Sequence, residues 1–583
     1  MTEPYLARTR LVIPADAVWR VLASPAGARQ WLGDPWHPGL QEGALVPVRG
    51  SRPAVIDGIA PDGTLSLLFE GGRRATVEVR PDGADTIMVV TDYGGDALAV
   101  GWDGLLTAAR FLADRTHARR RPRQAVVVIH GMGNQRPNAT VRRLGDALAP
   151  PQEQFSKPDQ VSRAYDLRRS QLERKRNRPR TDIYELYWAH RVPTTGWGQL
   201  TAWLRSVFLR DPRRIHPRLR PLVLLFYGVL LTALMGAGAL VLVVGTQWFD
   251  GIKANTSTLT QAGGVSLLLS LLSGAVSGVL LSTFGDVARY LDDAPGNVAV
   301  RQGIRDSGVA LLRRLHEGGL YDRIVVVGHS LGSVIGYDII RLYWAEVNGL
   351  HGSPPPFKQE ALDAYRRLLA APVTDLVGYQ TAQRKLWMEY RRLGSPWLVT
   401  DFVTLGSPLS LADTLLARSP ADLELHKARQ ELPTCPPTCD PKKLAIRVQY
   451  LADGRILTVR TLPAGAPFAV VRWTNLYFPS RFLFFGDPVG GPLAPVLGGG
   501  IKDVQVTTDS RLRRGTPLAH TSYWRATAEH PDAAVRALTE AVGIESGRWL
   551  NGHLAAMPWE CSVPPGPSRP RAADREPPPA DTP

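Results

Sequence analysis

The chain has 583 residues, of which 44% are hydrophobic and 21% are charged, with a formal net charge of +16. This composition excludes a wholly disordered protein, and the length predicts three or four domains. Three cysteines in so long a chain cannot form a disulfide framework, which fits a reducing compartment. The first residues lack the basic start and apolar stretch of a secretory signal.

Residues 1–116 are predicted to form a small α+β unit. A strand-like start leads into a short helix over Ala15–Ala23, and an amphipathic helix runs from about Trp102 to Ala113. Between them, short alternating segments separated by turn residues are expected to be strands. These segments are Ala54–Ile59, Leu65–Glu70, Ala75–Arg80 and Thr86–Asp92.

Several residues of this unit are similar to a known family. Val18-Trp19, Trp31 and Gly101-Trp102, together with the strand pair, resemble the SRPBCC (START-like) superfamily, especially its heat-shock ATPase-activator-homologue branch. The resemblance implies a helix-grip fold, in which a curved sheet grips a helix around an apolar cavity. Either that cavity holds a hydrophobic, lipid-like ligand or the core is filled by side chains, and the sequence leaves both open.

Basic clusters follow this unit. Residues 117–124 read as a polar linker with a strong positive run, and a second cluster lies at Leu167–Arg180. No nucleic-acid-reading motif accompanies them, so we expect them to bind anionic lipid headgroups and not nucleic acid. At the other end, residues 561–583 are rich in Pro and Arg and are predicted to be a disordered tail.

Two uncharged apolar runs, 221–245 and 264–284, are long enough to cross a bilayer as helices. A buried helical hairpin in a soluble domain is the alternative, but core helices usually keep a polar face. Arginines are concentrated before the first run, whereas the loop 246–262 holds one acidic and one basic residue. The positive-inside rule therefore predicts a two-pass membrane protein whose soluble domains both face the cytoplasm.

The most specific motif is the G-x-S-x-G sequence centred on Ser330. A β-branched strand over Ile324–Val327 leads into it, and a helical pattern follows it. Gly328 and Gly332 suit a tight strand-to-helix turn that leaves no room for side chains. This context is that of a nucleophile elbow, so we predict Ser330 as the nucleophile. Ser407, in a Leu-Gly-Ser-Pro sequence, lacks the second glycine and is interpreted as a turn residue.

An oxyanion hole is expected beside this serine. The strand Ala125–Ile129 ends at His130-Gly131-Met132, and a backbone donor follows such a strand in serine hydrolases. We predict the amides of Met132 and Leu331 as the two donors. Loss of one such donor typically costs about 3 kcal/mol of transition-state stabilisation.

The acid and the base of a triad should follow the nucleophile in chain order. Asp487 lies in a loop after the strand Phe468–Leu476, and His520 follows the strand Ile501–Thr507. We predict that Asp487 orients the imidazole of His520, which acts as the base. Weaker alternatives, within or near strands or in late segments, are Asp401, Asp503, His530 and His553.

These motifs together resemble the lipase-like α/β-hydrolases, including the GPI-inositol-deacylase-like group, over Gln124–Trp559. The resemblance implies an α/β-hydrolase fold over residues 125–560, with the transmembrane helical hairpin inserted before the elbow strand, and hydrolysis of carboxylic esters that are often lipids. Asp440–Leu462 departs from the minimal fold and is interpreted as a cap or an added hairpin. Cys435 and Cys439 have no second pair, so no zinc site is expected, and neither a metal nor an organic cofactor is implied.

The sequence thus predicts a membrane-anchored serine esterase or lipase-type hydrolase that forms an acyl-enzyme on Ser330. Its expected partners are an ester substrate, a membrane and a hydrophobic ligand of the N-terminal unit. Three alternatives remain: a non-catalytic membrane module, a lipid sensor or transfer protein in which the N-terminal unit is primary, and an effector that damages its own membrane. Headgroup, acyl chain, oligomeric state and the choice between hydrolysis and acyl transfer stay open.

Overall fold

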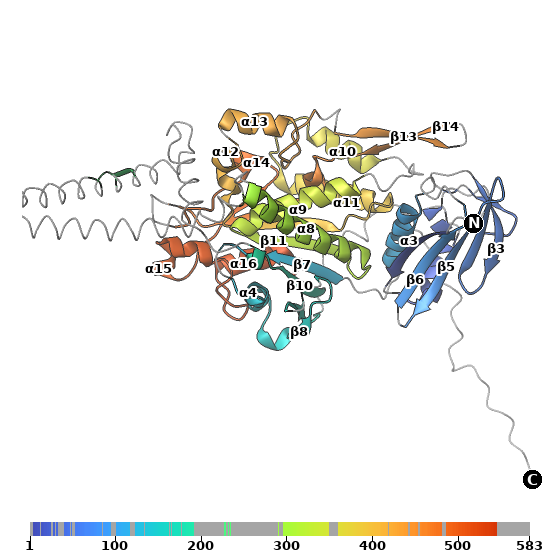
Figure 1. Ribbon diagram of the computed structural model, residues 1–583, viewed down its shortest axis with the longest axis horizontal. Helices are drawn as coiled ribbons and strands as arrows, with labels where there is room; N and C mark the ends of the chain where they lie inside the picture. The colour runs from blue at the N-terminus through green and yellow to red at the C-terminus, as the bar shows by residue number, and fades with distance from the viewer. Residues whose placement is uncertain are drawn as a thin grey trace, which may run out of the picture. The chain divides into compact units, whose positions relative to one another are not determined.

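The computed structural model describes residues 4–191, 290–480 and 486–544, apart from short gaps, together with four residues between 227 and 234 (Figure 1). The longest of these gaps are 33–39, 95–100, 117–122 and 349–358. The chain divides into two compact units, one of Met1–Arg120 with Asn551–Pro583 and one of Arg121–Leu550.

The first unit is built on a six-stranded antiparallel sheet with the order β1-β6-β5-β4-β3-β2. Buried and more exposed residues alternate along β4 and β6, because successive side chains of a strand point to opposite faces. The helices α1 (Ala15–Leu22) and α3 (Trp102–Thr116) contribute buried side chains to the core on one face. The strands are β1 (Tyr5–Leu11), β2 (Leu45–Val46), β3 (Ala54–Ala60), β4 (Thr64–Phe69), β5 (Arg74–Asp82) and β6 (Asp85–Asp92).

A buried polar contact ties this sheet to its last helix. The carboxylate of Asp92 is fully buried and accepts a hydrogen bond of 2.7 Å from Nε1 of Trp102, and it also pairs with Arg73. Burial works to raise the pKa of Asp92, but the hydrogen bonds and the arginine outweigh it and lower that pKa. The negative charge of Asp92 is therefore paired with Arg73 at the start of α3.

The second unit contains an eight-stranded mixed sheet with the order β16-β15-β12-β11-β7-β10-β9-β8. The strands from β16 to β10 are parallel to their neighbours, and β9 and β8 are antiparallel. The central strands are buried throughout, as strands covered on both faces must be. The strands are β7 (Arg123–Ile129), β8 (Gln154–Pro158), β9 (Arg168–Leu172), β10 (Arg180–Leu186), β11 (Arg323–His329), β12 (Val399–Leu405), β15 (Arg472–Tyr477) and β16 (Lys502–Gln505).

Helices cover both faces of this sheet (Figure 1). One core cluster joins Val126 and Val325 of the sheet to α4 and α16. On the other face α9 packs so closely that a side chain at Gly336 would come within 2.8 Å of the ring of Phe402. The helices are α4 (Ala139–Leu148), α8 (Pro295–Glu317), α9 (Leu331–Val347), α10 (Glu360–Leu368), α11 (Leu376–Arg392), α12 (Ala412–Leu415), α13 (Pro420–Ala428), α14 (Ala494–Leu497), α15 (Arg511–Arg514) and α16 (Ala533–Val542).

The segment Asp440–Leu462, interpreted from the sequence as a cap or an added hairpin, contains an antiparallel hairpin. Its strands are β13 (Ile446–Ala452) and β14 (Arg455–Thr461), and they form a two-stranded sheet of their own. The hairpin is therefore an addition to the eight-stranded sheet and supplies no strand to it.

The predicted fold class is wrong in two respects. The described residues form two antiparallel sheets, of six and two strands, and one mixed sheet of eight strands, and no helix among them is long and apolar enough to cross a membrane. The proposed α/β-hydrolase fold with an inserted transmembrane hairpin, and the helix-grip description of the N-terminal unit, are therefore not upheld. Short motifs constrain a single turn, whereas the pairing of strands depends on contacts far apart in the sequence.

The predicted localisation is corrected for the same reason. Both predicted spans, 221–245 and 264–284, lie outside the described residues except for Tyr227, Gly228, Leu231 and Leu234. A two-pass protein with both soluble domains in the cytoplasm is thus not supported. An uncharged run of 20 residues is long enough to cross a bilayer as a helix, but its length does not establish that it forms such a helix.

Candidate active site

Ser330 occupies the turn between β11 and α9. Its backbone has φ 52° and ψ −127°, a conformation that non-glycine residues seldom adopt and that functional sites often hold. A side chain at Gly328 would lie 2.5 Å from Cα of Ser333, and one at Gly332 would lie 2.3 Å from the carbonyl oxygen of Ile129. Both glycines are therefore required by the close packing of this turn.

His520 and Asp487 are brought together from different loops. Nδ1 of His520 lies 2.9 Å from Oδ1 of Asp487, which also accepts hydrogen bonds of 2.9 Å from the amides of Val489 and Gly490. The hydroxyl of Tyr523 donates to Oδ2 of Asp487 over 2.7 Å. These four bonds satisfy a carboxylate that is completely buried.

The charge state of Asp487 follows from these contacts. Burial by itself would raise the pKa of this carboxyl group. The interaction with His520 and the hydrogen bonds from Gly490 and Tyr523 outweigh burial and lower the pKa to about 2. Asp487 is therefore an anion at neutral pH, and it holds the proton of His520 on Nδ1.

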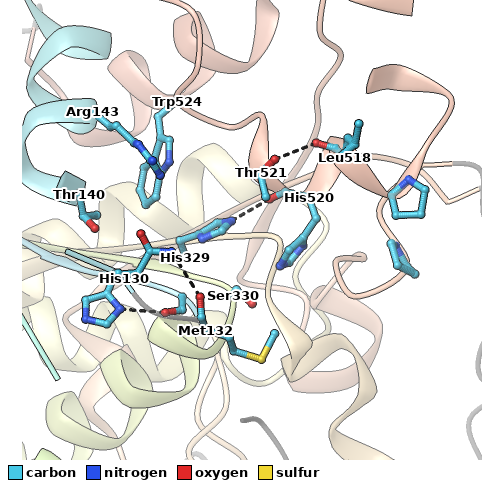
Figure 2. A pocket seen from close by; sticks show the side chains of 14 residues that line it. His130, Met132, Thr140, Arg143, His329, Ser330, Leu518, His520, Thr521 and Trp524 are labelled. Carbon is cyan, nitrogen blue, oxygen red and sulfur yellow. Dashed lines mark hydrogen bonds between the residues drawn. The ribbon is translucent and has the colours of Figure 1, made fainter. Parts of the chain in front are cut away.

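Ser330 and His520 each leave one buried polar atom without a hydrogen bond. Oγ of Ser330 and Nε2 of His520 are both buried and have no partner in the part of the chain that the structure describes. Both residues line the same cavity, whose volume is about 490 Å³ (Figure 2). Unpaired buried polar atoms are rare in native proteins, so two at one cavity make it a candidate functional site.

The cavity is lined by a mixed set of side chains. Met132, Leu518 and Trp524 provide apolar surface, and Gln135 and Thr140 provide polar groups. The full set is His130, Gly131, Met132, Gln135, Thr140, Arg143, His329, Ser330, Pro488, Pro517, Leu518, His520, Thr521 and Trp524.

Two backbone segments that contain the predicted donors lie beside Ser330. Leu331 is the first residue of α9, and the first amides of a helix have no partner within it. Met132 follows β7 and lines the cavity. A side chain at Gly131 would come within 2.9 Å of Cβ of Ser330, so glycine is what allows this segment to approach Ser330. The predicted donors Met132 and Leu331 thus both lie next to Ser330.

Two further histidines at the cavity are buried and neutral. Nε2 of His130 accepts a hydrogen bond of 3.1 Å from the amide of Trp188, and burial lowers the pKa of His130 to about 4. Nε2 of His329 lies 2.8 Å from the backbone oxygen of His520, and burial lowers the pKa of His329 to about 3. With so low a pKa His329 carries one ring proton, and Nε2 donates it to that oxygen.

The sequence did not single out three residues that the site depends on. Gly406 has φ 56°, and a side chain there would lie 2.8 Å from Oδ2 of Asp487 and 3.0 Å from Nδ1 of His520. Tyr523 donates a hydrogen bond to Asp487, and His329 donates one to the backbone oxygen of His520. Gly406 belongs to the Leu-Gly-Ser-Pro sequence and His329 to the elbow motif. Their positions in these motifs were the sequence features that could have identified them.

The alternative acids have other partners. Asp401 is buried and surrounded by arginines, and Oδ1 of Asp401 accepts a hydrogen bond of 2.7 Å from Nε of Arg472. Burial works against that charge, but the arginines lower the pKa of Asp401 to about 2. Asp503 accepts from Asn475 over 2.7 Å and from two backbone amides. The carboxylates of Asp401 and Asp503 are therefore already bonded to other groups in and around the sheet.

The remaining alternatives do not reach the cavity or lie outside the described residues. His530 is exposed and does not line the cavity, and His553 is outside the described part of the chain. Cys435 is buried, and burial raises the pKa of its thiol to about 12, which keeps it protonated. Over the described residues, no group of His, Cys, Asp and Glu is arranged to hold a metal ion.

Comparisons with known proteins identify no family for this chain. No protein-family model and no curated protein matches it. Among similar solved structures, the protein SSP2350 from Staphylococcus saprophyticus is 13% identical over 18% of this chain and 88% of its own, with a TM-score of 0.16. The Aha1 dimer from Colwellia psychrerythraea is 11% identical over 19% of this chain and 94% of its own, also at 0.16.

A third structure, DynU16 from the dynemicin biosynthetic locus, is 23% identical over 19% of this chain and 48% of its own, with a TM-score of 0.16. Likenesses at this level carry no argument about the fold or the function. The predicted membership in the lipase-like α/β-hydrolases, fused to an SRPBCC domain, is therefore corrected: no hydrolase family is found. A G-x-S-x-G match is short enough to arise by chance, so it cannot by itself establish a family.

Proposed function

We propose that this protein is a serine hydrolase that cleaves carboxylic esters, with Ser330 as nucleophile, His520 as base and Asp487 as the orienting acid. One observation carries the proposal. Oγ of Ser330 and Nε2 of His520 are buried without partners at one cavity, while Nδ1 of His520 is held by a buried, ionised carboxylate. Nucleophile, base and orienting group form the arrangement that acyl transfer to a serine requires.

The first half of the reaction uses the free nitrogen of His520. Because Asp487 accepts the Nδ1 proton, the lone pair of His520 is on Nε2. Nε2 takes the Ser330 hydroxyl proton as Oγ attacks the acyl carbon, and Asp487 stabilises the resulting imidazolium. The imidazolium then protonates the leaving alcohol, which departs and leaves an acyl-enzyme on Ser330.

The second half uses water. Nε2 of His520 removes a proton from a water molecule as it attacks the acyl carbon, and the proton then passes to Oγ of Ser330 as the acid is released. In both halves a negative charge develops on the acyl oxygen. The amides of Met132 and Leu331 would stabilise that oxygen, and each such donor is worth about 3 kcal/mol in the transition state.

The lining of the cavity suits an ester with an apolar part. Met132, Leu518, Trp524, Pro488 and Pro517 supply that surface. A lipid-like ester remains our proposal on this basis, although the membrane hairpin from which it was first predicted is not supported. Ligand pockets commonly combine such apolar walls with a few polar groups that orient the substrate.

Labelling with a fluorophosphonate probe tests this function. The parent should be labelled, and Ser330→Ala and His520→Ala should not be. Ser156→Ala, in the exposed strand β8, and His530→Ala, an exposed histidine away from the cavity, are matched controls that should retain labelling. A parent protein that is folded by circular dichroism but unlabelled would contradict the proposal.

A further inference from the structure

The charges on the side chains that line the cavity are not balanced. Among the described residues, Arg143 is the one permanently charged side chain that lines the cavity, and no described carboxylate lines it. His130 and His329 are neutral, because burial lowers their pKa values to about 4 and about 3. Asp487 is completely buried behind His520, and its charge is stabilised by its own hydrogen bonds. Among the described residues, a ligand in the cavity therefore contacts a positive side chain and no negative one, because His520 separates it from Asp487.

Arg143 has no acidic partner among the described residues. It lies on α4, where its guanidinium is exposed, and Figure 2 places it among the residues that line the cavity. Some arginines of the same unit are paired with acids: Arg169 pairs with Asp182 over 3.3 Å and Arg305 with Asp338 over 2.6 Å. An unpaired guanidinium at a cavity is available to a ligand.

A second group of cations precedes the segment that carries the base. Arg511, Arg513 and Arg514 lie on α15, directly before the 3-10 helix η7 (Pro517–Thr521), which contains Leu518 and His520. None of the three forms an ion pair within the described parts of the chain. Uncompensated positive charge near a site raises the local concentration of anions and their rate of association.

We infer that the ester substrate carries an anionic group, a carboxylate or a phosphate, and that Arg143 binds this group. The inference rests on the proposed hydrolase function and adds the substrate class to it. A guanidinium suits either anion, because its planar fork donates two parallel hydrogen bonds to carboxylate or phosphate oxygens. The apolar walls would hold the chain between the anion and the ester, and a cavity of about 490 Å³ falls within the usual range for small ligands.

A matched set of three 4-nitrophenyl esters tests the inference. The hexanoate is neutral, the adipate monoester adds a terminal carboxylate at nearly the same length, and the 5-phosphonopentanoate replaces that carboxylate with a phosphonate. We expect a higher kcat/KM for one or both anionic esters. In Arg143→Gln the ratio of kcat/KM for the anionic to the neutral ester should fall about fivefold or more, the size expected for one partly exposed charge pair.

Two variants control for the position and the charge. Arg142→Gln removes the neighbouring exposed arginine of α4, which does not line the cavity, and should leave the ratio unchanged. Arg143→Lys keeps a positive charge and should restore part of the ratio. A larger effect on the phosphonate than on the adipate would identify the phosphate class, and the reverse would identify the carboxylate class.

A binding measurement separates this inference from the proposed function. Calorimetry with the Ser330→Ala protein reports binding of the same esters without turnover. Tighter binding of an anionic ester that is lost in Ser330→Ala/Arg143→Gln supports the anion site, even if the parent cleaves no ester and the hydrolase proposal fails. Equal binding of the neutral and anionic esters, or an equal loss of both in Arg143→Gln, would overturn the inference while leaving the hydrolase proposal intact.

Discussion

His329 and His520 are joined by a hydrogen bond of 2.8 Å between Nε2 of His329 and the backbone oxygen of His520. His329, which precedes the proposed nucleophile, therefore holds the segment that carries the proposed base, His520. His329 is fixed in β11, and His520 lies in η7 with a loop on each side. The bond thus couples a rigid strand to a more weakly supported segment.

We expect His329→Ala to lower kcat through misplacement of His520. A displacement of about 1 Å in a catalytic group can cost roughly 100-fold. His329→Gln, whose amide can donate to the same oxygen, should recover part of the rate. Both variants should still bind the substrate in a Ser330→Ala background, as calorimetry can check. Equal losses in the Ala and Gln variants would show that the hydrogen bond is not what matters.

Asp487→Asn should abolish most of the activity with little change in fold. The amide can donate to Nδ1 of His520, which would shift the proton to Nε2 and remove the base. In a serine triad this change lowers kcat by about 10⁴-fold. Steady-state kinetics with a 4-nitrophenyl ester measures it. Asp503→Asn, in an acid that does not bond to His520, is the comparison, and a similar loss there would argue for general damage.

Gly406→Ala should reduce both stability and activity. At φ 56° an alanine is strained by about 1–3 kcal/mol, and its Cβ would meet Oδ2 of Asp487 at 2.8 Å and Nδ1 of His520 at 3.0 Å. Gly72 also has a positive φ, of 80°, but has open space where its Cβ would lie. Gly72→Ala therefore measures the backbone strain alone. Urea unfolding and fluorophosphonate labelling should show that only Gly406→Ala loses labelling.

Stability should decline as the pH falls below about 6.5. The pKa values of His130 and His329 are lowered from an ordinary 6.5 to about 4 and about 3, so the unfolded chain binds protons in this range that the folded chain does not. Each such group reduces the free energy of unfolding by about 1.4 kcal/mol per pH unit, until the pH reaches its folded pKa.

The buried acids extend this loss to lower pH. The pKa of Asp487 is lowered from 3.8 to about 2, so its contribution is present above pH 4 and is lost between about pH 4 and pH 2. Urea unfolding at a series of pH values measures both ranges. In His130→Gln the slope between pH 6.5 and pH 4 should be shallower. An unchanged slope would mean that His130 does not remain neutral in the folded protein.

Local sequence patterns predicted the strand–turn–helix around Ser330 because this turn is set by neighbouring residues. The strand ends at His329, the helix begins at Leu331, and Gly328 is needed because a side chain there would meet Ser333 of the same motif. Gly332 is needed because of Ile129 of β7, a contact that only the tertiary structure shows. The order of the strands in chain and the positions of Asp487 and His520 after them also allowed these residues to be predicted as partners. Their roles in a reaction remain a proposal.

Family membership and membrane topology could not be predicted in the same way. The family was inferred from short motifs, and no family model matches the chain. The membrane spans were inferred from apolar composition alone, and no described helix meets the requirements of a span. An apolar composition indicates that a segment avoids water, but it does not show whether lipid or protein covers that segment.

What only the tertiary structure decided is which distant groups meet at the cavity. The bonds of Asp487 to Tyr523 and of His329 to His520, and the approach of Gly406 to Asp487 and His520, join segments far apart in the chain. The structure also places Arg143 at the cavity with no acidic partner among the described residues. Such contacts depend on strand order and on burial, and short sequence patterns carry only local information. The sequence by itself determined the strand–turn–helix around Ser330, because its strand, turn and helix are formed by residues close to one another in the chain.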